Sequence, residues 1–67
     1  MVNICKLKGI IAEKGFSQKS LAEMLGISTP TMYSKMKKGV FGSDEITAMA
    51  RILQLNKDEV INIFFAN

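Results

Sequence analysis

The middle of the sequence holds a three-residue turn, Gly26-Ile27-Ser28, between two short segments with helical spacing of apolar residues. Leu21 and Leu25 precede the turn, and Met32 and Met36 follow it, each pair separated by one helical turn. Glycine ends a helix because it adopts positive φ without a Cβ clash, and serine begins one because its hydroxyl accepts from free backbone N–H groups. The pattern therefore predicts two short helices joined by a tight turn.

Capping residues set the expected limits of these two helices. Ser17 is a good N-cap for a helix over about residues 18–25, which is so short that packing must stabilise it. Ser28 is expected to cap the next helix, and Gly39 to end it. Pro30 is compatible with the first turn, where the missing N–H would have no helical partner.

A further helix is predicted before this pair. Its apolar residues share one helical face: Ile4, Leu7 and Ile11. Asn3 is a suitable N-cap, and Gly15 suits the other end, so the helix is expected over about residues 3–14.

Two more helices are predicted after the pair. Ser43 is expected to cap a fourth helix, whose apolar positions are Ile46, Met49, Ala50 and Leu53. Asn56 and Glu59 resemble a capping box for a last helix over about residues 57–66. Phe41, in the loop before the fourth helix, is expected to be anchored in the core.

Strict alternation of apolar and polar residues nowhere lasts for the length of a strand. Five short helices joined by short loops predict an all-α fold. A chain of 67 residues is expected to form one small domain over residues 1–67.

The composition excludes several classes of protein. The chain has no histidine and one cysteine, Cys5, so a disulfide framework, a Cys/His zinc site and imidazole catalysis are excluded. No nucleophile–base pair and no glycine-rich phosphate loop is present, so we expect no enzyme, no cofactor, no metal and no small-molecule substrate. No apolar run is long enough for a membrane span or a signal peptide, and a lone thiol suits a reducing cytoplasm.

Positive charge is concentrated in the middle of the chain. The net charge is +3, and residues 14–39 hold five lysines and one acid, Glu23. Clustered lysines favour an anionic partner. The alternative is that they only keep a small domain soluble.

A three- or four-residue turn containing glycine is typical of a helix-turn-helix motif, here over about residues 17–38. Residues 17–28, SQKSLAEMLGIS, resemble the opening of the Cro and phage-repressor helix-turn-helix, and residues 31–36, TMYSKM, resemble the recognition helix of its phage members. Residues 45–53 and 60–65 resemble the last two helices of small repressors from phages of Gram-positive bacteria. The resemblance covers nearly the whole chain and implies a five-helix lambda-repressor-like domain.

The resemblance also implies a function, that of a transcriptional regulator which binds an operator in double-stranded DNA with its third helix in the major groove. Gln18 matches a position that contacts a phosphate and supports the recognition helix. The residues expected at the DNA are Gln18, Lys19, Ser28, Thr29, Pro30, Thr31, Tyr33, Ser34, Lys37 and Lys38.

The recognition helix departs from the family pattern in its hydrogen-bonding groups. Pro30 has no donor and offers only an apolar contact, for example to a thymine methyl. The face lacks Arg, Gln and Asn, which make the commonest two-pronged base contacts. Base reading is therefore expected to depend on Lys37, on hydroxyls, on water or on DNA shape.

The last helix has more apolar residues than one core-facing stripe needs: Val60, Ile61, Ile63, Phe64 and Phe65. We expect a homodimer through this helix, with Ile61, Phe64 and Phe65 at the interface. Such a dimer would place two recognition helices about 34 Å apart on a near-palindromic site. The alternative is an aromatic cluster that closes the core.

Two other functional interpretations remain open from the sequence. The few base-reading donors on the third helix are compatible with a protein-interaction module that uses its apolar last helix. The chain is also compatible with the DNA-binding fragment of a larger two-domain repressor. The leading prediction is a Cro-type regulator, with no membrane association.

Overall fold

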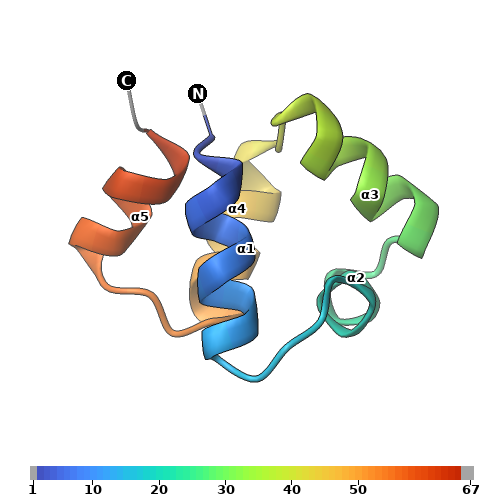
Figure 1. Ribbon diagram of the computed structural model, residues 1–67, viewed down its shortest axis with the longest axis horizontal. Helices are drawn as coiled ribbons and strands as arrows, with labels where there is room; N and C mark the ends of the chain where they lie inside the picture. Colours follow the sequence, from blue (N-terminus) through green and yellow to red (C-terminus); the bar gives the residue numbers. More distant parts are fainter. Residues whose placement is uncertain (1, 66–67) are drawn as a thin grey trace.

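The computed structural model describes residues 2–65, and these form five α-helices with no strand among them. The helices are α1 (Ile4–Glu13), α2 (Gln18–Leu25), α3 (Thr29–Lys38), α4 (Ser43–Ile52) and α5 (Lys57–Phe64). Figure 1 shows α1 at the centre of the molecule, with α5 on one side of it and α2 and α3 on the other. The predicted all-α fold is confirmed.

Most of the predicted caps are present. The Asn3 side chain accepts from the Lys6 N–H at 3.2 Å and begins α1. Ser17 and Ser20 form a reciprocal capping box at α2, each side chain accepting from the other's backbone N–H at 3.0 and 2.9 Å. Asn56 and Glu59 form the same arrangement at α5, at 2.9 and 2.8 Å. Each pair satisfies N–H groups that the first helical turn leaves without partners.

The start of α4 differs from the prediction. Its N-cap is Gly42, and Ser43 is the first helical residue rather than the cap. Glu45 explains the difference, because its Oε1 accepts from the Gly42 N–H at 2.7 Å. The carboxylate thus reaches back over the first turn and satisfies the N–H of the cap residue itself, as the glutamate of a capping box does.

One apolar core joins all five helices. Leu7 of α1, Leu21 of α2, Met32 of α3 and Met49 of α4 are fully buried, and Phe64 of α5 is nearly so. The predicted anchoring of the loop is confirmed, since Phe41 is buried in the same core.

The packing partners position α3 at the edge of the molecule. Helix α2 packs against α3 and α4, and α1 packs against α5. A backbone hydrogen bond joins the two ends of the fold, in which the Asn3 N–H donates to the Ile63 carbonyl at 2.7 Å. Because α3 contacts mainly α2, one long side of it is left without a protein partner (Figure 1). No helix within residues 2–65 is long and apolar enough to cross a membrane.

Candidate nucleic-acid interface

The turn between α2 and α3 has the geometry that the sequence predicts. Gly26 ends α2 at φ 75°, a conformation that costs energy for a residue that has a Cβ. The Ile27 N–H donates to the Ala22 carbonyl at 3.0 Å, and the Ile27 side chain packs against the core. Ala22 is fully buried, so its small side chain lies where α2 meets the rest of the fold. The turn therefore holds α3 at a fixed angle across α2.

Helix α3 has an inward and an outward face. Met32 and Met36 are buried, whereas the Tyr33 side chain is 53% exposed. The other exposed residues of α3 are Pro30, Thr31, Ser34, Lys37 and Lys38. Nearly all side chains expected at the DNA on this helix therefore lie on its solvent face.

The remaining residues expected at the DNA lie near the start of each helix of the motif. Ser28 and Lys19 are exposed, whereas Thr29 is only half-buried. Gln18, the first residue of α2, is half-buried.

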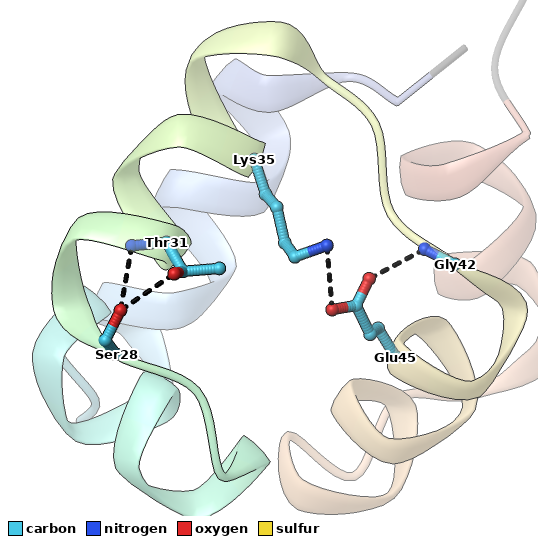
Figure 2. Close-up of polar contacts among 5 residues, drawn as sticks. All are labelled: Ser28, Thr31, Lys35, Gly42 and Glu45. Atoms are coloured by element: carbon cyan, nitrogen blue, oxygen red, sulfur yellow. Dashed lines mark hydrogen bonds and ion pairs between the residues drawn. The ribbon is translucent and has the colours of Figure 1, made fainter.

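Two hydroxyls at the start of α3 bind each other (Figure 2). The Ser28 Oγ accepts from the Thr31 N–H at 3.2 Å and lies 2.7 Å from the Thr31 Oγ1. The predicted Ser28 cap is confirmed. These contacts use two of the three hydrogen-bonding positions of the Ser28 hydroxyl and one of those of Thr31.

Lys35 has a different role from the lysines beside it. Figure 2 shows its side chain extending from α3 toward the start of α4, where its Nζ lies 3.1 Å from the Glu45 Oε2. Lys37 and Lys38 have no such ion pair within residues 2–65. Of the three lysines in the last turn of α3, Lys37 and Lys38 are the two that remain available to an anion. No spacing rule could have found the pair, since its partners lie on different helices.

Glu45 connects the two helices through both of its carboxylate oxygens. One accepts from the Gly42 N–H and the other pairs with Lys35. Burial alone would raise the pKa of the Glu45 carboxyl, but the Gly42 hydrogen bond and the Lys35 ammonium outweigh it and lower the pKa below its usual 4.5. Glu45 is therefore ionised at neutral pH and fixes the end of α3 against α4.

The last helix corrects one residue of the predicted dimer interface. Phe64 is only 3% exposed, because it points into the core together with Ile63, so it has no surface to offer a partner. Ile61 and Phe65 are 46% and 59% exposed. Ile61 lies on α5, and Phe65 is the residue that follows its end. Phe65 also borders an apolar groove of about 530 Å³ beside α4.

Two short helices joined by a glycine turn, the second with an open polar and basic face, make a helix-turn-helix DNA-binding domain. The family model of the Cro/C1-type HTH DNA-binding domain matches residues 6–65, which include nearly all of the five helices. The chain belongs to this family. No curated protein and no solved structure gives a significant match.

Proposed function

We propose that this protein is a sequence-specific transcriptional repressor of the Cro type, which inserts α3 into the major groove of an operator. The observation that carries the proposal is the outward face of α3, which is exposed along its length and is opposite to the buried Met32 and Met36. A major groove about 12 Å wide admits a helix of this kind. The bound protein would block polymerase by occupancy, without catalysis, in the cytoplasm of a bacterial host.

Affinity in this proposal comes mainly from phosphate contacts. Lys38 has no ion pair within residues 2–65 and lies on the open side of α3. Lys19 is exposed at the start of α2, beside Gln18. These positions suit the sugar–phosphate backbone on either side of the groove, where lysines contribute affinity and orientation but no sequence information.

A homodimer on the DNA completes the proposal. Ile61 of α5 and Phe65 at its end are exposed apolar side chains. Helix α5 lies on the opposite side of α1 from α3 (Figure 1). The same patch on both subunits can form a two-fold interface. Two recognition helices would then meet half-sites about 34 Å apart. Residues 1–67 would act as one DNA-binding unit per subunit.

Salt-dependent binding tests the proposal. We expect fluorescence anisotropy with a random-sequence duplex to show an affinity that falls about a hundredfold between ~50 and ~200 mM salt if four phosphates are neutralised. Lys38→Ala should reduce the slope by about one. The matched control Lys8→Ala removes an exposed lysine of α1, outside the interface, and should leave the slope unchanged. Absence of binding at the lowest salt would contradict the proposal.

A second candidate is a protein-interaction module, and the exposed apolar side of α5 favours it. Phe65 borders the apolar groove at α4 and Ile61 is exposed on α5, so these apolar side chains are open to a partner helix. The salt titration distinguishes the two candidates, because an interaction module of this kind has no need to release counterions from DNA.

A further inference from the structure

The outward side chains of α3 form one row. At about 100° per residue, positions i, i+3, i+4 and i+7 share a helical face. Pro30, Tyr33, Ser34 and Lys37 occupy these positions, and all four are exposed. The row is well separated around the helix axis from Met32 and Met36, so it is the part of α3 that would enter the groove deepest.

The hydrogen-bonding groups of this row are few. Adenine is read best by a side-chain amide, which donates and accepts at once, and the row has none. The hydroxyl of Thr31, beside the row, is already bound to Ser28 at 2.7 Å. The ends of the row are therefore the most distinctive chemically, with an apolar ring at Pro30 and an ammonium at Lys37.

Each end matches a different feature of the major groove. Pro30 has no hydrogen-bond donor in its backbone or its side chain, so it can only make apolar contacts. The apolar feature of the major groove is the C5-methyl of thymine. Lys37 only donates, and guanine offers two neighbouring acceptors, O6 and N7. Lys37 forms no ion pair with an acid in the described part of the chain, whereas the Lys35 Nζ lies 3.1 Å from the Glu45 Oε2.

The distance between the ends sets the spacing of the two bases. Seven residues separate Pro30 from Lys37, which is about 10 Å along the axis of an α-helix. Base pairs are stacked about 3.4 Å apart, so the two side chains span about three base-pair steps.

We propose that α3 reads a thymine methyl through Pro30 and, about three base pairs away, a guanine through Lys37. The inference rests on the proposed function, because it assumes that α3 occupies the major groove. It adds the two bases that carry direct recognition in each half-site.

Base analogues test the proposal on the unmodified protein. A duplex pool with a randomised centre supplies a preferred site by selection. In that site, each thymine is replaced in turn by deoxyuridine, which removes only the methyl, and each guanine by 7-deazaguanine, which removes N7. We expect one deoxyuridine to weaken binding about fourfold, and one 7-deazaguanine, about three base pairs from it, to weaken binding about tenfold.

Two variants assign each effect to its residue. Pro30→Ser keeps a residue suited to a first helical turn, and should abolish the deoxyuridine effect while leaving the 7-deazaguanine effect. Lys37→Met keeps the aliphatic stem, and should abolish the 7-deazaguanine effect while leaving the deoxyuridine effect. Lys8→Met, on α1, is the matched control and should preserve both effects.

The outcomes separate this inference from the proposed function. Salt-dependent binding without any enriched sequence, or analogue effects that persist unchanged in both variants, would overturn the assignment of Pro30 and Lys37 alone. Absence of salt-dependent binding to any duplex would overturn the proposed function itself.

Discussion

At the scale of single residues, glycine has opposite effects in a turn and in a helix. Gly26 lies at φ 75° with no atom near the position of an added Cβ, so substitution there meets conformational strain but no clash. Gly9 lies inside α1, on the solvent side, also with open space around it. Replacing each glycine by alanine therefore changes the free energy of unfolding mainly through the conformational preference of the backbone.

We expect Gly26→Ala to lower the free energy of unfolding by about 1 kcal/mol and Gly9→Ala to raise it by about 0.8 kcal/mol. Urea denaturation of both variants measures the two changes. If both variants changed the free energy of unfolding in the same direction, backbone conformation would not be the dominant effect at the turn.

Local chemistry explains why single residues were largely predictable. Asn3, Ser17, Ser28 and Asn56 cap helices within three residues of themselves, so the sequence alone identifies them. Gln54 escaped prediction, because it adopts φ 53° after α4 without being a glycine. Two backbone hydrogen bonds close the helix end around it, from the Gln54 N–H to the Arg51 carbonyl and from the Leu55 N–H to the Ala50 carbonyl. The end was missed because glycine, not glutamine, is the residue that usually marks it.

At the scale of elements, Glu45 ties α3 to α4. Its pKa is lowered in the folded protein, so the bridge contributes stability at pH values above about 4.5 and loses it as the pH falls through the folded pKa. Because both partners are partly exposed, the contribution is small, about 0.5 kcal/mol.

We expect Glu45→Gln to lower the free energy of unfolding at pH 7 by about 0.5 kcal/mol and by less near pH 3, so the variant has a flatter pH profile. Thermal melts across this range measure the difference. Asp44→Asn is the matched control, since it removes a neighbouring carboxylate that makes no ion pair within residues 2–65. An equal flattening in Asp44→Asn would assign the effect to the helix terminus instead of the bridge.

At the scale of the whole molecule, the adjacent phenylalanines at the end of α5 have different roles. Phe64 closes the core, and Phe65 lies mainly in solvent. We expect Phe64→Ala to lower the free energy of unfolding by about 3–4 kcal/mol, because it leaves a cavity in the core. We expect Phe65→Ala to change stability by less than about 1 kcal/mol and to weaken dimerisation.

Urea denaturation and sedimentation equilibrium, applied to both variants, measure these effects separately. A Phe65→Ala protein that dimerises as well as the wild type would remove this side of α5 from the proposed interface. A stable Phe64→Ala protein would contradict its place in the core.

The sequence by itself determined the number of helices, most of their caps and the glycine turn, because each depends on groups within one or two helical turns of each other. It also predicted the helix-turn-helix and the open face of α3, since the spacing of Met32 and Met36 already defines an inward side. Tertiary structure alone decided that Lys35 binds Glu45 and that Phe64, not Phe65, is buried. These outcomes depend on how one helix docks against another, and docking angles arise from packing between residues that are distant along the chain.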